Sequence, residues 1–291
     1  MPKKNFHAGL EKCCFFPANL LIFQITFVPC SPLLQQVPSM PKTVCITGAS
    51  SGFGLACAHR FAENGWRLII FARREEKLRQ FARAYPDLPV HYAGLDVRNR
   101  RQVEECIGNL PESFAEIDVL INNAGLALGL SGAQEADMDD WEIMVDTNIK
   151  GLLYMTRAVL PGMVARNRGH IINMGSVAGT YPYPGGNVYG ASKAFVKQFS
   201  KNLLTDLVQT GIRVTNIEPG LAESEFSVVR FHGDREKADQ VYRGTEPITP
   251  DDIAEIVYWT TSMPPHVNIN TVEVMPVCQS CGPFLIHREN E

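Results

Sequence analysis

Short apolar runs alternate with amphipathic segments along the chain from Thr43 onward. Runs such as VLIN and LIIFA are apolar on both faces, which is typical of strands covered by helices on either side. The pattern predicts seven strands, namely VCITG, RLIIFA, VHYAGLD, DVLINNAG, HIINMGS, IRVTNIEP and TVEVMPV. Helical spacing predicts helices at 54–64, 75–84, 100–109, 139–165, 187–209 and 250–262.

Strands separated by helices of this length imply right-handed crossovers and a parallel sheet. We therefore expect an α/β fold, a single-domain Rossmann-type doubly wound seven-stranded parallel sheet, over residues 41–291. After residue 40 the sequence contains no internal repeat, low-complexity tract or linker, so one domain is the economical interpretation. Ligands of such sheets bind at the carboxyl ends of the strands, and the residues that follow each strand are the candidates for chemistry.

The first forty residues have a different character. Their apolar stretch, residues 15–28, is too short to span a bilayer. Basic residues precede it as in a signal peptide, but the Pro-Cys-Ser-Pro that follows is a poor cleavage site. Met40 stands three residues before the first strand and looks like a natural start. We expect residues 1–40 to be an extension outside the fold.

Composition narrows the function classes. The 291 residues are 45% hydrophobic, enough to bury a sizeable core, and a net charge of −4 without basic runs argues against a nucleic-acid partner. We expect no membrane partner either. The eight cysteines lack the spacing of a disulfide framework, which favours a reducing, cytoplasmic location. Cys278 and Cys281 form a lone CxxC without a second ligand pair, and we interpret them as incidental thiols.

A glycine-rich turn follows the first strand. Glycines allow the backbone to turn tightly beside a pyrophosphate, whose charge is met by free N–H groups at the next helix. The spacing is G-x-x-x-G-x-G, and glycine also serves ordinary turns. The position between the first strand and the first helix favours a nucleotide. The candidate residues are Gly48, Ala49, Ser50, Ser51, Gly52, Phe53 and Gly54.

The end of the second strand indicates which nucleotide binds. NAD-preferring sites place an acidic residue there for the ribose 2′-hydroxyl, whereas this chain has Arg73 and Arg74 and no carboxylate before Glu75. Guanidinium groups bind phosphate through a planar fork, so NADP is favoured. The alternative is that both arginines are solvated residues opening the next helix.

Two further strand ends supply candidates for cofactor binding. Asp96 and Val97 end the third strand, where the carboxylate can hold the adenine amino group. Asn123, Ala124 and Gly125 follow the fourth strand, where small residues and an amide can line a ribose. Taken alone, either group is compatible with ordinary turn chemistry.

The most specific pattern is Tyr189-Gly-Ala-Ser-Lys193, with Ser176 thirteen residues earlier at the end of the fifth strand. Residues i and i+4 share a helix face. A free tyrosine has a pKa of about 10. We expect the Lys193 ammonium and a positive nicotinamide ring to lower the pKa of Tyr189, with Lys193 bonding the nicotinamide ribose and Ser176 orienting the substrate oxygen. Y-x-x-x-K alone occurs by chance, but here the glycine loop and NNAG precede it in order.

These motifs resemble the short-chain dehydrogenase/reductase family over residues 43–288. The resemblance implies a tetrad of Asn148, Ser176, Tyr189 and Lys193, with Asn148 holding a water that links the lysine to solvent. It also implies hydride transfer at the nicotinamide C4 carbon, no metal, and a homotetramer. Further cofactor contacts implied on the matching Pro-Gly segment are Pro219, Gly220, Leu221, Ser224 and Phe226.

A narrower resemblance is to bacterial NADP-dependent 3-hydroxy acid dehydrogenases, a subgroup that includes malonic semialdehyde reductase, serine 3-dehydrogenase and L-allo-threonine dehydrogenase. It implies L-serine, L-allo-threonine, 3-hydroxyisobutyrate, 3-hydroxypropionate or malonic semialdehyde as substrate. A carboxylate calls for a cationic anchor, for which Arg230 is our first candidate and Lys150 the second, against the alternative of surface residues. The loop at 222–224 looks one residue shorter than the subgroup pattern. This leaves open which hydroxyl group contacts the carboxamide of the nicotinamide.

Three alternatives belong to other classes. A non-catalytic NADPH-binding sensor would keep the pocket, although such proteins usually lose the tyrosine or lysine that this chain retains. A sugar-nucleotide epimerase or dehydratase would need more length than the fifteen residues after Pro276. A reductase of bulkier ketones or ketoacyl thioesters is compatible with the same fold and tetrad.

Overall fold

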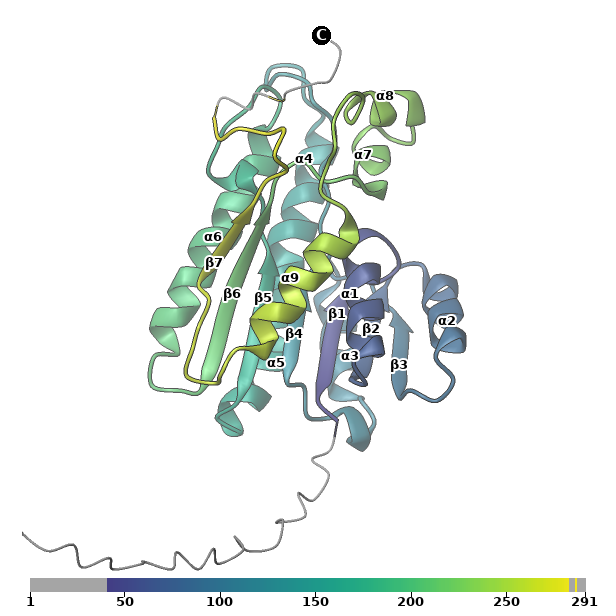
Figure 1. The fold of residues 1–291 in the computed structure, drawn as a ribbon, viewed down its shortest axis with the longest axis vertical. Helices are drawn as coiled ribbons and strands as arrows, with labels where there is room; N and C mark the ends of the chain where they lie inside the picture. The colour runs from purple at the N-terminus through teal and green to yellow at the C-terminus, as the bar shows by residue number, and fades with distance from the viewer. Residues whose placement is uncertain (1–40, 283–285, 287–291) are drawn as a thin grey trace, which may run out of the picture. The chain divides into compact units, whose positions relative to one another are not determined.

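The computed structural model describes residues 41–282 and residue 286, so the predicted extension at 1–40 lies outside the described part. All seven predicted strands form one parallel sheet in the order β3-β2-β1-β4-β5-β6-β7 (Figure 1). The predicted fold class is therefore confirmed. The strands are β1 Thr43–Thr47, β2 Arg67–Ala72, β3 Val90–Gly94, β4 Val119–Asn122, β5 Gly169–Met174, β6 Ile212–Pro219 and β7 Thr271–Val274.

The helices follow the predicted alternation with two differences. The expected helix at 139–165 is divided by a π-helical turn, η2, at Asp146–Gly151. Two short helices in the stretch after β6, α7 and α8, were not predicted because six residues are too few to show periodicity. The helices are α1 Gly52–Glu63, α2 Glu75–Ala84, α3 Arg100–Gly108, α4 Met138–Val145, α5 Leu152–Ala165, α6 Asn187–Asp206, α7 Glu225–Arg230, α8 Arg235–Gln240 and α9 Pro250–Ser262.

The central strands are buried on both faces, and β1 shows how the sequence achieves this. Val44 and Ile46 pack in a core with residues of α1, α2 and α9. Cys45 points to the opposite face, into a second core with residues of α3, α5 and α6. Because side chains alternate along a strand, a strand that contributes to two cores must be apolar at every position.

The topology places a crevice beside the carboxyl end of β1. β1 pairs with β2 on one side and β4 on the other, so the connections diverge to opposite halves of the sheet. Ligands of doubly wound sheets bind at such a point. Figure 1 shows α7 and α8 at this same end of the sheet, beyond the tips of the arrows. None of the helices in residues 41–282 combines the length and apolar character needed to cross a bilayer.

We expect the two-sided core to set much of the stability. Val44 is fully buried in β1, whereas Val208 is 78% exposed after α6. Val44→Ala should lower the free energy of unfolding by about 2 to 3 kcal/mol through lost burial and a residual cavity. Val208→Ala removes the same atoms from water-exposed surface and is the matched control. Urea unfolding of both variants checks this, and equal losses would contradict the described core.

Candidate active site

A cavity of about 560 Å³ opens at the carboxyl ends of the strands. It brings together residues from the ends of β1 to β6, from α6 and from the segment leading through α7. The predicted residues that line it are Gly48, Ser50, Ser51, Gly52, Phe53, Arg73, Arg74, Asp96, Val97, Asn123, Ala124, Gly125, Ser176, Tyr189, Lys193, Pro219, Gly220, Ser224 and Phe226. The predicted residues outside its lining are Ala49, Gly54, Leu221, Asn148 and Arg230.

The glycine loop packs against the segment that follows β4. Gly48 has a φ of +68°, and a Cβ there would lie 2.9 Å from the side-chain nitrogen Nδ2 of Asn123. A Cβ on Gly54 would overlap both Gly48 O and the Asn123 amide, so Gly54 permits close packing without lining the cavity itself. Thr47 Oγ1 accepts hydrogen bonds from the backbone N–H groups of Asn123 and Ala124, both at 3.0 Å. The positive φ and the close packing both favour glycine at position 48, whereas close packing alone explains Gly54.

The start of α1 retains donors for an anion. Ser51 is its N-cap residue, but the Ser51 side chain makes no capping hydrogen bond. The N-cap side chains of α3, α7 and α9 accept bonds from their own first turns, whereas α2, α5 and α6 lack such a cap as α1 does. The N–H groups at a helix start that no side chain caps can bind phosphate with help from the helix dipole.

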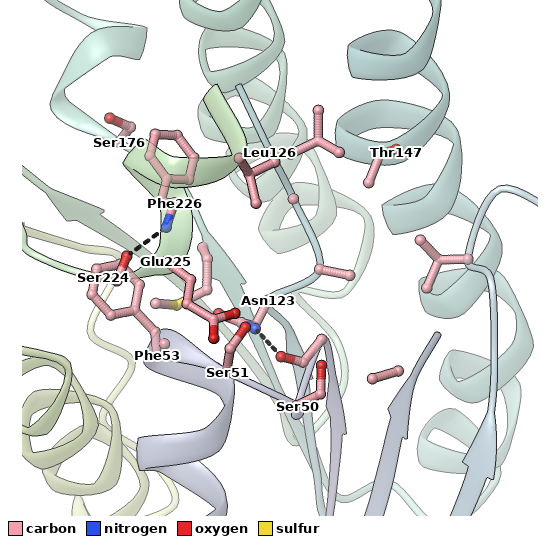
Figure 2. Close-up of a pocket in the computed structure, with 18 of the residues that line it drawn as sticks. Ser50, Ser51, Phe53, Asn123, Leu126, Thr147, Ser176, Ser224, Glu225 and Phe226 are labelled. Carbon is pink, nitrogen blue, oxygen red and sulfur yellow. Dashed lines mark hydrogen bonds between the residues drawn. The ribbon is translucent and has the colours of Figure 1, made fainter. Parts of the chain in front are cut away.

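The two arginines after β2 have different surroundings. Arg74 Nε donates to Ser50 Oγ at 3.1 Å, and Arg74 Nη1 lies 2.9 Å from Glu225 Oε2 of α7. Arg73 is exposed at the rim of the cavity. Figure 2 shows Ser224, Glu225 and Phe226 gathered near Ser51 and Phe53. Sequence reasoning missed Glu225 because its ion pair joins residues 151 positions apart, and nothing in the pattern around it signals the contact.

Asp96 is also paired. Its carboxylate accepts from Arg98 Nε at 3.0 Å and from Arg98 Nη2 at 2.6 Å. This hydrogen bonding is the largest cause that holds the pKa of Asp96 below its usual value. The carboxylate therefore stays ionised at the cavity wall, where it can accept a further N–H.

Ser176, Tyr189 and Lys193 meet at the inner wall of the cavity. Ser176 follows β5, and its Oγ donates to Pro219 O at 3.4 Å and accepts from Ala178 N at 3.1 Å. It lies close enough to Tyr189 of α6 to lower the pKa of the phenol. Lys193, one turn further along α6, donates from Nζ to Met174 O at 2.7 Å and lies 5.8 Å from the centroid of the Tyr189 ring. The predicted grouping on one helix face beside a strand end is thus present.

Burial dominates the electrostatics of this cluster in the protein alone. Burial raises the pKa of Tyr189 to about 12, while Ser176 and the charge of Arg230 act in the opposite direction. Burial also lowers the pKa of Lys193 to about 8. In the protein alone, desolvation of the phenol outweighs these effects, and Arg230 is the cation that opposes it. The expected lowering by Lys193 together with a bound nicotinamide ring stays a prediction.

Asn148 lies in the π-helical turn, where its side chain fixes backbone. Its Oδ1 accepts from Leu126 N at 2.9 Å, and its Nδ2 donates to Leu126 O at 2.8 Å and to Ser192 Oγ at 3.0 Å. A Cβ on Gly125 would lie 3.3 Å from Asn148 Oδ1 and 3.5 Å from Lys193 Nζ. The amide thus ties the segment after β4 to α6 directly beside Lys193. π-helical turns are frequent at functional sites. The position of the Asn148 amide could not be predicted from a continuous helix, because the π-helical turn changes the direction of its side chain.

The two candidate anchors have different outcomes. Arg230 ends α7, and its guanidinium carbon lies 5.2 Å from the centroid of the Tyr189 ring, although Arg230 does not line the cavity. Lys150 is exposed and pairs with Asp146 at 2.7 Å, away from the cavity lining. In the shortened loop, Ser224 Oγ accepts from Phe226 N at 3.3 Å and caps α7 (Figure 2). The structure therefore brings Arg230, and not Lys150, to the cluster.

A doubly wound sheet with a glycine loop after β1 and a serine, tyrosine and lysine grouped at β5 and α6 defines a dinucleotide-binding dehydrogenase. The sequence model of the family described as short chain dehydrogenase matches residues 42–234, and the chain belongs to this family.

Known relatives extend the match over most of the chain. An NADP-dependent 3-hydroxy acid dehydrogenase of Salmonella typhi is 58% identical over 84% of this chain and 99% of its own length. A sulfoacetaldehyde reductase of Chromohalobacter salexigens is 50% identical over 86% of this chain and all of its own. Among solved structures, the closed form of a serine dehydrogenase complexed with NADP⁺ is 54% identical, with a TM-score of 0.82, covering 85% of this chain and 100% of that one.

The lowered pKa of Lys193 predicts a pH-dependent stability. Between pH 8 and about 10.5 the native amine has lost its proton while the unfolded chain keeps it, so wild-type stability rises through this window, by at most about 1.4 kcal/mol per pH unit. Lys193→Met lacks this contribution. Urea unfolding between pH 7.5 and 10 should show wild type gaining stability relative to the variant as pH rises. A constant difference would mean that the native amine has an ordinary pKa.

Proposed function

We propose that the protein is an NADP-dependent oxidoreductase that interconverts small 3-hydroxy acids and their 3-oxo acids or semialdehydes. The observation that carries this is one cavity that joins the glycine loop and Arg73 to Ser176, Tyr189 and Lys193. The candidate substrates are L-serine, L-allo-threonine, 3-hydroxyisobutyrate, 3-hydroxypropionate and malonic semialdehyde. The names of the dehydrogenase relatives support this class.

The residues of the cavity fit the dinucleotide. The uncapped start of α1 suits the pyrophosphate, and Arg73 and Arg74 suit the 2′-phosphate. Asp96 and Val97 suit the adenine, Asn123 to Gly125 a ribose, and Lys193 the nicotinamide ribose. The segment from Pro219 to Phe226, with Leu221 behind it, would hold the carboxamide end. When bound, the cofactor supplies the carbon that gives or takes the hydride.

The protein's own groups handle the substrate proton. Ser176 binds the substrate oxygen and directs it to the nearby Tyr189 hydroxyl, whose pKa Ser176 helps to lower. A phenol with a pKa of about 12 is fully protonated at neutral pH and is ready to donate to the oxygen of an aldehyde undergoing reduction. Acting as a base on an alcohol requires added positive charge near the phenolate. Lys193, held by Met174 O, and Asn148, through the segment after β4, keep the cluster in place.

Arg230 is the group we assign to the acid end of the substrate. Among the described residues, no carboxylate lies within salt-bridge distance of Arg230, so its charge is not neutralised by the protein. The guanidinium stands beside the Tyr189 ring, just outside the cavity lining. We assign it to a carboxylate one carbon away from the reacting centre because a guanidinium binds a carboxylate through a planar fork. A reductase of bulkier ketones would have no need of this charge.

Cellular location and assembly stay predictions. The described cysteines at 45, 57, 106, 278 and 281 are all free thiols, which supports a reducing, cytoplasmic compartment. The homotetramer implied by the family resemblance awaits a measurement of mass in solution.

Tyr189→Phe tests the proton step. The variant keeps the ring but loses the hydroxyl, so reduction of malonic semialdehyde should fall by about 100-fold or more. NADPH absorbance at 340 nm follows turnover, and NADPH fluorescence titration should show the binding retained. Turnover at the parent rate would remove Tyr189 from the mechanism. Tight NADPH binding by wild type without turnover of any 3-hydroxy acid would instead favour a sensor.

Arg73→Ala tests cofactor choice. Loss of a charge-assisted bond to the 2′-phosphate should raise the KM for NADPH by about tenfold or more while leaving the KM for NADH nearly unchanged. Arg83→Ala, an exposed arginine at the end of α2, is the matched control. Equal effects of Arg73→Ala on both cofactors would show that Arg73 does not discriminate between them.

A further inference from the structure

Three aromatic rings surround the guanidinium of Arg230. Its carbon lies 5.2 Å from the ring centroid of Tyr189, 5.3 Å from that of Phe226 and 5.7 Å from that of Tyr183. Ring faces attract a cation without neutralising it. Arg230 Nη2 also donates to the Tyr183 hydroxyl at 2.6 Å. Of the three aromatic residues, Tyr183 therefore both faces the guanidinium and holds it through a hydrogen bond.

The loop that carries Tyr183 is built tightly against its neighbours. Gly185 has a φ of +74°, and a Cβ there would overlap the backbone of Leu130. A Cβ on Gly186 would lie 2.7 Å from the Tyr183 ring, and Gly186 N donates to Tyr183 O at 3.0 Å. The Asn187 side chain donates to Ser131 O at 3.2 Å. Two glycines thus set the position of this ring, since larger residues would displace either the loop or the phenol.

Arg230 is fixed at its backbone as well. Its carbonyl accepts from Gly129 N at 3.0 Å, in the same segment after β4 that the Tyr183 loop contacts. Both ends of Arg230 are therefore tied to one local framework. A long side chain held at both ends loses little further rotamer freedom when a ligand binds.

The chemistry of the acceptor matters. A phenol accepts one N–H bond and remains neutral, whereas a carboxylate in its place would cancel the charge. Arg74 provides the contrast within this chain, because Glu225 pairs with it at 2.9 Å. Arg230 Nε is buried and has no hydrogen-bond partner in the described part of the chain. Arg60, Arg67 and Arg166 share this feature, so it does not by itself mark a ligand site. A buried donor without a partner is costly, and an acceptor brought by a ligand would relieve that cost at Arg230.

We propose that Tyr183 is a positioning residue that holds the Arg230 guanidinium, still charged, where it receives the acid group of the substrate. The proposal rests on the function proposed above and adds the residue that determines its preference for acidic substrates. Tyr183 acts through Arg230 and takes no part in proton transfer. Its sequence context, Pro-Tyr-Pro-Gly-Gly, signals a turn and gives no indication of this role.

Steady-state kinetics with NADPH and two aldehydes of similar size test this. Malonic semialdehyde carries the acid group, and propanal lacks it. Tyr183→Phe should raise the KM for malonic semialdehyde by about tenfold, the order expected for one hydrogen bond to a charged group, with kcat within about twofold. The kinetic constants for propanal should not change. Tyr181→Phe is the matched control. It removes a hydroxyl from the same loop, but the Tyr181 hydroxyl donates to Glu273 and not to Arg230.

A double-mutant cycle separates positioning from general damage. In an Arg230→Gln background, Tyr183→Phe should produce no further rise in the KM for malonic semialdehyde. An unchanged KM in the single variant, or an equal fall in kcat for both aldehydes, would overturn the role of Tyr183. If Arg230→Gln raises that KM while Tyr183→Phe does not, Arg230 still binds the acid group, but the positioning role of Tyr183 is refuted. If wild type shows no preference for malonic semialdehyde over propanal, the proposed function fails instead.

Discussion

Burial of a phenol and an amine on one helix face is the constraint on which the rest of the site depends. Desolvation raises the pKa of Tyr189 and lowers that of Lys193, so each group is pushed toward its neutral form. The surrounding groups partly compensate for this cost, since Met174 O accepts from the amine and Ser176 opposes the rise in the pKa of the phenol. Because β5 ends at Met174 and Ser176 lies just beyond it, the sheet itself delivers both partners to α6.

The sheet end and the following segments meet so closely that side-chain size is restricted. Gly48 and Gly54 let the first loop reach the segment after β4, and Gly125 leaves room for Asn148 beside Lys193. The side-chain amide of Asn148 hydrogen-bonds both the N–H and the carbonyl of Leu126. The same framework thus shapes the glycine loop and supports the lysine, which couples the geometry of cofactor binding to that of proton transfer.

Helix α7 carries opposite charges at its two ends, and only the acidic one lines the cavity. Glu225, at its start, pairs with Arg74 beside the glycine loop. Arg230, at its end, stands among aromatic rings next to Tyr189 and has a neutral phenol as its bonded partner. One arginine is neutralised by the protein and the other keeps its charge. A short helix of six residues therefore links the part of the site that suits a phosphate to the part that suits an acid.

The sequence by itself determined the fold class, because hydrophobic periodicity is a local property of the chain. It also placed Tyr189 and Lys193 on one helix face through their i, i+4 spacing, and Ser176 just after the fifth strand. It also identified Arg230, although without its surroundings. Only the tertiary structure decided that Lys150 pairs with Asp146 outside the cavity lining, that Asn148 lies in a π-helical turn and that Tyr183 bonds Arg230. It also decided that burial is the largest cause of the pKa shift of Tyr189. Those outcomes depend on contacts between residues far apart in sequence and on exclusion of water, neither of which leaves a periodic trace along the chain.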